Sequence, residues 1–208
     1  TAIGHRTVHG GDYFSDSVLI TQETVDKVTE CNALAPLHNP ANLLGIAVCA
    51  EQLPNLPQVA VFDTAFHQTM PDYAYLYATP RSWERDHHVR RYGFHGTSHR
   101  YITQKTAELL GKPMSDLNII SAHLGNGSSV AAVVGGKSVD TSMGFTPLPG
   151  LIMGTRTGDI DPAIITYMME RLNISAEAVL DLMNKKSGLL GISELTNDCR
   201  ELTEAANK

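Results

Sequence analysis

A glycine-rich turn in the middle of the chain carries groups that suit phosphate binding. Residues 123–129 read His-Leu-Gly-Asn-Gly-Ser-Ser and lie between the apolar segments 117–122 and 130–134. This order predicts a strand, a tight turn and a second strand, and the glycine pair at 135–136 predicts a hairpin after it. Because glycines leave the backbone open, the N–H groups of the turn, with Asn126 and the two serines, can approach a phosphate. An ordinary hairpin corner is the alternative interpretation.

Two charged side chains, Arg156 and Asp63, also stand where ligands are commonly bound. Arg156 lies in the segment 153–162, whose glycines, threonines and aspartates are typical of a loop. We therefore expect its guanidinium to face solvent or a ligand rather than the core. Asp63 follows a predicted strand, 58–62, at the C-terminal edge where open α/β sheets bind ligands. A structural salt bridge is the alternative role for either residue.

His95 lies between two glycines, directly before a predicted helix that ends near residue 110. Thr97 or Ser98 is the predicted cap of this helix. The positive end of a helix dipole favours a bound anion and opposes protonation of the imidazole ring. Most single histidines have structural roles, but this position makes His95 a candidate for contact with a ligand.

Further segments predict alternating strands and helices, and hence an α/β fold. Strands are predicted at residues 2–9 and 58–62, and helices at 22–31, 40–52, 162–172 and 175–184. The helix at 40–52 begins with proline, which is favoured at the first helical position. Its apolar residues recur at helical spacing and predict a stripe that faces the core: Leu43, Leu44, Ala47 and Val48. Ser175 is the predicted cap of the last helix.

The composition excludes several classes of protein. The 208 residues carry a formal charge of -6 and no basic block, so nucleic acid is not an expected partner. No apolar run reaches the roughly 18 residues that suggest a membrane span, and we expect neither a membrane partner nor a leader. Cys31, Cys49 and Cys199 are widely spaced, which predicts reduced thiols rather than disulfides or a zinc site. These features together predict a cytoplasmic protein.

Six motifs, in order along essentially the whole chain, resemble those of the acetate kinases: residues 5–11, 36–40, 61–68, 92–99, 123–129 and 154–162. The resemblance implies reversible phosphoryl transfer between ATP and acetate, with Mg2+ or Mn2+, in a cytoplasmic homodimer. It also implies the two-domain sugar kinase and actin-like (ribonuclease H-like) α/β fold. Residues 1–64 would be a remnant of the first α/β domain, and residues 65–208 would be part of the second, with the nucleotide-binding motifs.

The resemblance also implies roles for individual residues. The implied catalytic residues are Arg6, Asp63, His95 and Arg156. The implied nucleotide contacts are His123, Leu124, Gly125, Asn126, Gly127, Asp198, Cys199 and Arg200. The implied substrate pocket is formed by Arg6, Val8, Leu37, His38, Phe94 and Pro147. Arg6 would hold the carboxylate or the phosphoryl group, while Arg156 and His95 would stabilise the charge in transfer. Asp63 would orient the arginine and metal-bound water or act in proton transfer, and no residue is assigned as a metal ligand.

The chain departs from the family pattern at both ends. The family's first phosphate turn, its later adenosine motif and a metal-binding glutamate have no counterpart here, which implies an interior portion of a longer enzyme that is inactive alone. Pro149 stands where the family usually has an acidic residue. Three functions stay open: an acetate kinase, a propionate or other short-chain acyl kinase, and a noncatalytic nucleotide-binding or assembly fragment. The first two are hard to separate because one methylene discriminates by only about 1–3 kcal/mol.

Overall fold

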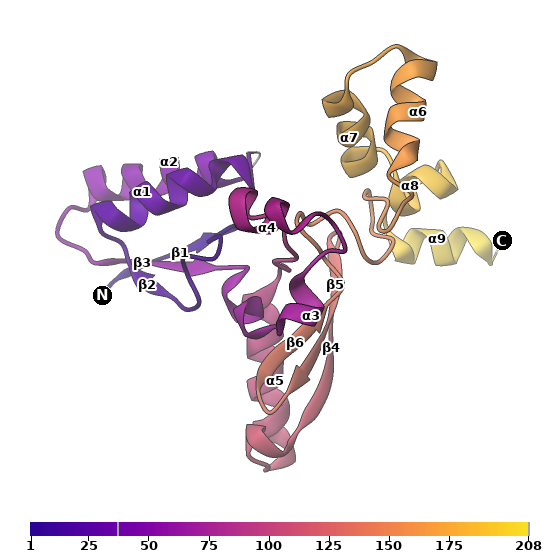
Figure 1. Ribbon diagram of the computed structural model, residues 1–208. Helices are drawn as coiled ribbons and strands as arrows, with labels where there is room; N and C mark the ends of the chain where they lie inside the picture. Colours follow the sequence, from indigo (N-terminus) through magenta and orange to yellow (C-terminus); the bar gives the residue numbers. More distant parts are fainter. Residues whose placement is uncertain (37, 208) are drawn as a thin grey trace.

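The structure is a computed structural model and describes residues 1–36 and 38–207. Figure 1 shows three groups of elements: an N-terminal sheet with two helices, a second sheet with a long helix, and a C-terminal group of helices that stands apart from both sheets. Within these residues, no helix has the length and apolar character needed to cross a membrane. The predicted α/β class is confirmed.

The first group is a three-stranded sheet with two helices on one side (Figure 1). β1 (Ile3–Thr7) pairs in parallel with β3 (Gln58–Phe62), which also pairs antiparallel with β2 (Val18–Leu19), in the order β1-β3-β2. The helices are α1 (Gln22–Glu30) and α2 (Asn39–Gln52), with the short turn η1 (Cys31–Ala33) after α1. The core of this group contains Phe14, Val28, Ala60, Phe62 and Ala65.

α2 starts one residue earlier than predicted and does not bury the predicted stripe. Leu44 and Val48 are 66% and 48% exposed, whereas Asn39 and Ile46 are buried. Leu43 packs against the core and is partly buried. The predicted stripe was therefore wrong for Leu44, Ala47 and Val48, all of which are exposed. Apolar residues occur around much of this helix, so helical spacing alone did not determine which face points inward.

The second group is an antiparallel sheet packed against a long helix. β4 (Asn118–Leu124), β5 (Ser128–Val134) and β6 (Lys137–Thr141) pair in the order β4-β5-β6, which confirms the predicted strand, turn and strand. α5 (Gly96–Leu110) lies along this sheet (Figure 1) and buries His99, Thr103 and Ala107, which follow one another at four-residue intervals. The shorter elements around it are η2 (Ala65–Thr69), α3 (Asp72–Tyr75), α4 (Arg81–His87) and η3 (Met114–Asp116).

α5 begins without the side-chain cap that the sequence predicted. Its N-cap residue is His95, which has the left-handed φ of 57° and makes no side-chain capping hydrogen bond. The prediction of Thr97 or Ser98 as the cap was therefore wrong, because both residues lie inside the first turn. The Ser98 hydroxyl instead lies 2.9 Å from Nδ1 of His123. The helix thus starts directly at the histidine, and its backbone positions the ring.

The third group contains four helices. They are α6 (Ala163–Leu172), α7 (Ala176–Lys185), α8 (Gly188–Ser193) and α9 (Cys199–Ala206). The predicted cap of α7 is confirmed, because the Ser175 hydroxyl accepts a hydrogen bond from the N–H of Ala178 at 3.2 Å. Arg156 lies in the long connection between β6 and α6. The domain boundary predicted near Thr64 falls between the two sheets and stays a prediction.

Candidate active site

Arg6 and Asp63 form a two-pronged ion pair at the C-terminal ends of β1 and β3. The parallel register places Thr7 beside Phe62, so both side chains lie at the same edge of the sheet. Nε and Nη2 of Arg6 lie 3.1 and 2.6 Å from the two carboxylate oxygens of Asp63. Asp63 is 3% exposed, whereas the Arg6 side chain is 65% exposed. The hydrogen bond that Arg6 donates to Asp63 raises the pKa of Arg6, and the guanidinium held in this way can bind an anion with its outer side.

The end of β3 is joined closely to the start of α5. The N–H of Gly96 donates to the carbonyl oxygen of Asp63 at 2.9 Å. A methyl group at Gly96 would collide with that same oxygen, so this junction requires glycine. It brings His95, the residue before Gly96, into the same cleft as Arg6 and Asp63.

His95 and His123 are stacked at this cleft. Their ring centroids are 4.0 Å apart with an interplanar angle of 25°. Burial lowers the pKa of His95 to about 3, and the neighbouring histidines His123 and His99 act in the same direction. The ring is therefore neutral at pH 7. The predicted resistance to protonation is confirmed, but burial is the main cause rather than the helix dipole that the sequence suggested.

Arg156 reaches the cleft from the long connection after β6. Its Nη1 donates to the carbonyl oxygen of Pro147 at 2.9 Å. Burial, followed by the nearby charge of Arg6, lowers the pKa of Arg156. A methyl group at Gly127 would lie 3.2 Å from Nη1 of Arg156 and 3.4 Å from Nε2 of His95. The guanidinium and the imidazole therefore converge on the glycine turn. The loop composition around Arg156 predicted only that its guanidinium would face solvent or a ligand.

These side chains share one cleft of about 850 Å3. The residues that line it come from β1, β3, α5, the turn after β4 and the Arg156 segment: Gly4, His5, Arg6, Val61, Asp63, His95, Thr97, Ser98, Tyr101, His123, Gly125, Asn126, Gly127 and Arg156. Cationic and hydrogen-bonding groups thus face an open turn of backbone, an arrangement that can bind and stabilise a phosphoryl group. In the described part of the chain, no group of three or more His, Cys, Asp or Glu side chains is arranged to hold a metal ion.

The glycine turn differs in one respect from its prediction. The Ser129 hydroxyl is fully buried and lies between two histidines, and the Ser128 hydroxyl donates to the carbonyl of Gly125 at 2.9 Å. The suggestion that both serines approach a phosphate was therefore wrong. Asn126 is exposed, and its side-chain oxygen accepts a hydrogen bond from Asn197 at 2.9 Å. The segment before α9 is thereby fastened to the turn.

Other predicted nucleotide contacts lie at the start of α9. Asp198 is its N-cap and accepts a hydrogen bond from the N–H of Arg200 at 2.7 Å. Cys199 and Arg200 are exposed in the first turn, and Leu124 is exposed at the end of β4. The Asn197 contact brings this segment near the glycine turn. This position is compatible with the predicted nucleotide roles of Asp198, Cys199 and Arg200, which stay predictions.

The predicted substrate pocket is only partly represented in the cleft. Val8 and Phe94 are buried in a cluster with Met143 and Met153. His38 is half-buried, and burial together with the charges of Arg156 and Arg6 lowers its pKa, which places it near both arginines. Pro147 contributes its carbonyl to Arg156. Leu37 lies outside the residues that the structure describes.

Comparison with known proteins connects this geometry to one family. The profile of the Acetokinase family matches residues 1–208. The chain belongs to the acetokinase family. Acetate kinases of Thermoanaerobacterium thermosaccharolyticum and Bacillus subtilis are 61% and 60% identical to it over 100% and 99% of its length. This acetokinase chain spans about half the length of the curated relatives it matches, 52% in both cases.

Solved structures give the same result for the fold of this acetokinase chain. An acetate kinase of Porphyromonas gingivalis superposes with a TM-score of 0.93 at 53% identity, and a propionate kinase of Francisella tularensis with a TM-score of 0.95 at 55% identity. Each match covers 99% of this chain and about half of the other, 52% and 53%. The predicted family and fold are confirmed.

The sequence analysis did not predict the roles that several residues have at the site of this acetokinase chain. Ser98 and Ser129 hold the two stacked histidines, and His99 supports Ser129 from α5. Asn197 fastens the glycine turn to the segment before α9. The only available signal was the placement of Ser129 on the buried face of a strand, since buried polar side chains require hydrogen-bond partners.

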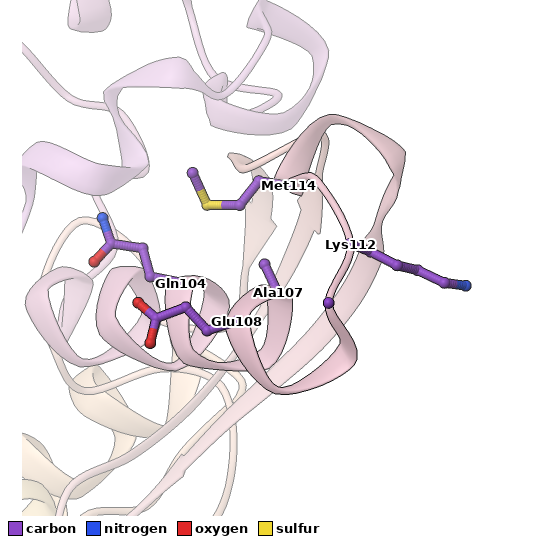
Figure 2. A pocket seen from close by; sticks show the side chains of 6 residues that line it. Gln104, Ala107, Glu108, Lys112 and Met114 are labelled. Carbon is purple, nitrogen blue, oxygen red and sulfur yellow. The ribbon is translucent and has the colours of Figure 1, made fainter.

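A second hollow of about 580 Å3 lies at the far end of α5 and contains no comparable chemistry. It is lined by Gln104, Ala107, Glu108, Gly111, Lys112 and Met114, and Figure 2 shows the Lys112 side chain pointing away from it. The carboxylate of Glu108, which lines this hollow, forms a salt bridge with Lys105. The groups that could stabilise a phosphoryl transfer are therefore those of the first cleft.

Proposed function

We propose that this chain forms part of an acetate kinase, which transfers the γ-phosphoryl group of ATP reversibly to acetate. The observation that carries the proposal is the convergence of Arg156 and His95 on Gly127, in the cleft that also holds the Arg6–Asp63 pair. The family membership and the relatives named acetate kinase support it.

Repulsion between two anions is the main obstacle to this reaction. Acetate is already ionised at pH 7, because the reference pKa of a carboxyl group is near 4. It therefore needs no strong base, but it must approach a phosphoryl group that is itself negatively charged. Positioned cations and hydrogen-bond donors supply most of the stabilisation in such transfers.

The cleft offers a separate task to each of three side chains. Arg6, held by Asp63, binds the carboxylate or the transferring phosphoryl group with its exposed side. Arg156 stabilises the equatorial oxygens of the phosphoryl group in transfer. His95, whose pKa of about 3 keeps it neutral, contributes a hydrogen bond from Nε2 rather than a full charge.

The nucleotide would lie along the glycine turn. The backbone of Gly125, Asn126 and Gly127 approaches its phosphates, and the segment of Asp198, Cys199 and Arg200 lies beyond Asn197 on the adenosine side. Mg2+ is usually held by one or two carboxylates together with substrate phosphates. Both oxygens of Asp63 are bonded to Arg6, so this carboxylate would act on the ion through metal-bound water. When bound, Mg2+ or Mn2+ neutralises charge on the phosphates, while Asp63 also keeps Arg6 in place.

A propionate or other short-chain acyl kinase is the second candidate. The propionate kinase of Francisella tularensis superposes on this chain as well as an acetate kinase does. Val8, Phe94 and Pro147 are the apolar residues expected near the methyl group, and one extra methylene changes the transition-state free energy by only about 1–3 kcal/mol. The ratio of kcat/KM for acetate, propionate and butyrate separates these two activities.

The 208-residue chain alone is proposed to be a noncatalytic fragment. Ile120 and Leu124 are each 75% exposed on β4, and the chain spans about half the length of its relatives. Exposed apolar residues on a sheet commonly mark a surface that another segment or subunit covers, which supports the proposal that the active enzyme is longer than this chain. Homodimerisation forms part of the same proposal. The free cysteines Cys31, Cys49 and Cys199 support a reducing, cytoplasmic location.

A coupled assay tests the proposed function. A polypeptide of the relatives' full length that carries this sequence is expected to form ADP only when both ATP and acetate are present. The 208-residue chain is expected to show no turnover in the same assay. Absence of acetate-dependent and propionate-dependent ADP formation by the full-length polypeptide would overturn the acyl kinase proposal, and turnover by the short chain would overturn its noncatalytic role.

A further inference from the structure

A continuous set of hydrogen bonds runs from His95 into the interior of the second group. The Ser129 hydroxyl lies 2.9 Å from Nδ1 of His95 and 2.8 Å from Nε2 of His99. The other ring nitrogen of His99, Nδ1, lies 2.9 Å from the Ser121 hydroxyl. Ser121, Ser129 and His99 are 2%, 0% and 0% exposed, so the three inner members are closed off from water.

The order of protons along this chain of groups has two possible directions. A hydroxyl carries one proton, so Ser129 donates to one histidine and accepts from the other. Burial lowers the pKa of His95 to about 3 and that of His99 to about 4, so each ring is neutral and carries a single N–H. If Ser129 donates to Nδ1 of His95, the proton of His95 is on Nε2. In the reverse order, Nε2 of His95 is a bare lone pair.

The buried end of this hydrogen-bond network favours the order in which Ser129 donates to Nδ1 of His95. Among the described residues, His99 is the hydrogen-bond partner of the Ser121 hydroxyl. In the first order, Ser121 donates to Nδ1 of His99, and every buried donor has an acceptor. In the reverse order, Ser121 accepts from His99, and its own proton is left buried without an acceptor, which costs free energy.

Arg156 acts in the opposite direction. A methyl group at Gly127 would touch both Nη1 of Arg156 and Nε2 of His95, so the guanidinium lies close to that ring nitrogen. A nearby cation favours a lone pair at Nε2 and disfavours an N–H there. Without a partner at Nδ1, the ring would therefore carry its proton on Nδ1 and present a lone pair at Nε2 to the cleft. The buried serines have to outweigh this effect.

We propose that Ser121, His99 and Ser129 are positioning residues that order the protons so that His95 presents an N–H from Nε2 to the cleft. The tautomer of His95 follows from the hydrogen bonds alone. Its benefit for phosphoryl transfer rests on the proposed acyl kinase function, because an N–H stabilises a phosphoryl oxygen whereas a lone pair repels it.

Nitrogen-15 NMR of histidine side chains in the 208-residue chain tests the tautomer without any reference to activity. The wild-type chain is expected to show protonated Nε2 and unprotonated Nδ1 at His95, in neutral solution. Ser129→Ala is expected to shift His95 toward the other tautomer, whereas Ser129→Thr, which keeps the hydroxyl, is expected to restore the wild-type pattern. A wild-type His95 protonated at Nδ1 would overturn the proposal even where a variant fails to fold.

Ser138→Ala is the matched control. Ser138 is also fully buried, lies on the neighbouring strand β6 and contacts a different histidine, with its hydroxyl 2.8 Å from Nδ1 of His67. Its loss removes a buried serine-histidine hydrogen bond without touching His95. The His95 tautomer is therefore expected to stay as in the wild type, and an equal shift in both alanine variants would show a general structural effect and overturn the specific role of Ser129.

Kinetics in the full-length polypeptide test the catalytic consequence. Ser129→Ala is expected to lower kcat about tenfold with little change in KM for ATP, because the lost hydrogen bond acts in the transition state. Ser129→Thr is expected to recover most of this loss, and Ser138→Ala to stay within about twofold of the wild type. A full-length polypeptide without kinase activity would contradict the proposed function but leave the NMR result intact. An unchanged kcat in Ser129→Ala would overturn the positioning role.

Discussion

Two fully buried histidines predict a loss of stability in mildly acidic solution. His9 and His67 are both 0% exposed, and burial lowers the pKa of each from 6.5 to about 4. Nδ1 of His9 accepts a hydrogen bond from the N–H of Gly11 at 3.0 Å, so a proton on that nitrogen would face another donor. His67 lies 2.9 Å from the carbonyl of Phe94 through Nε2 and uses Nδ1 toward Ser138. The folded chain therefore keeps both rings neutral.

The expected magnitude follows from the two pKa values. Below pH 6.5 the unfolded chain takes up protons that the folded chain does not. The stability that the two neutral rings contribute is therefore fully present above that pH and is lost as the pH falls toward about 4. Between about pH 7.5 and about pH 5, each histidine contributes a loss of about 2 kcal/mol, or about 4 kcal/mol for the pair. The pKa values of His95 and His99 are also lowered by burial, so these two rings add to the loss of stability.

Urea denaturation of the 208-residue chain at these two pH values measures the effect. His67→Gln is expected to reduce the difference in unfolding free energy by about 2 kcal/mol, the share of one buried histidine. His87→Gln, at an exposed position on α4, is the control and is expected to keep the wild-type difference. An unfolding free energy that is the same at both pH values would refute the reasoning, because the buried rings would then titrate as they do in the unfolded chain.

Substitutions at three positions test the remaining geometry. In the full-length polypeptide, Arg156→Ala is expected to lower kcat on the order of 10³-fold with a smaller effect on KM for ATP, and Arg156→Lys to recover little because it loses the planar fork. A folded alanine variant with near-normal kcat would contradict this role. Gly96→Ala is expected to destabilise the chain by about 2 kcal/mol, measured by urea denaturation, because its methyl group meets the carbonyl of Asp63. Gly45→Ala, inside α2 with nothing within 4 Å, is expected to stabilise it by about 0.5–1 kcal/mol, and two changes of the same sign would refute the distinction.

Local patterns in the sequence predicted most of the elements. The strand 58–62 has the predicted bounds, and the Ser175 cap of α7 forms the predicted hydrogen bond. These features depend on residues that are close together in the chain. Where the outcome depended on distant partners, the prediction failed: Leu44 and Val48 follow helical spacing, but the packing of α2 leaves them exposed.

The candidate site depends almost entirely on such distant contacts. Arg6 and Asp63 are 57 residues apart and meet because β1 and β3 pair in parallel. His95 and Ser129 are 34 residues apart and meet because α5 packs on the second sheet. The sequence could name Arg6, Asp63 and His95 from their local surroundings and the family resemblance, but it contained no local pattern for their mutual geometry.

Ser129 is the instructive exception, because its inward position follows from the strand itself. Side chains alternate between the two faces of a strand, so Ser129 must share a face with Ala131 and Val133. Those two residues are 0% and 1% exposed, and Ser129 is likewise 0% exposed. A hydroxyl on a buried face requires polar partners. We predicted contact between this serine and a phosphate, although strand alternation alone would have indicated an interior hydrogen bond, and His95 and His99 are the partners that the fold supplies.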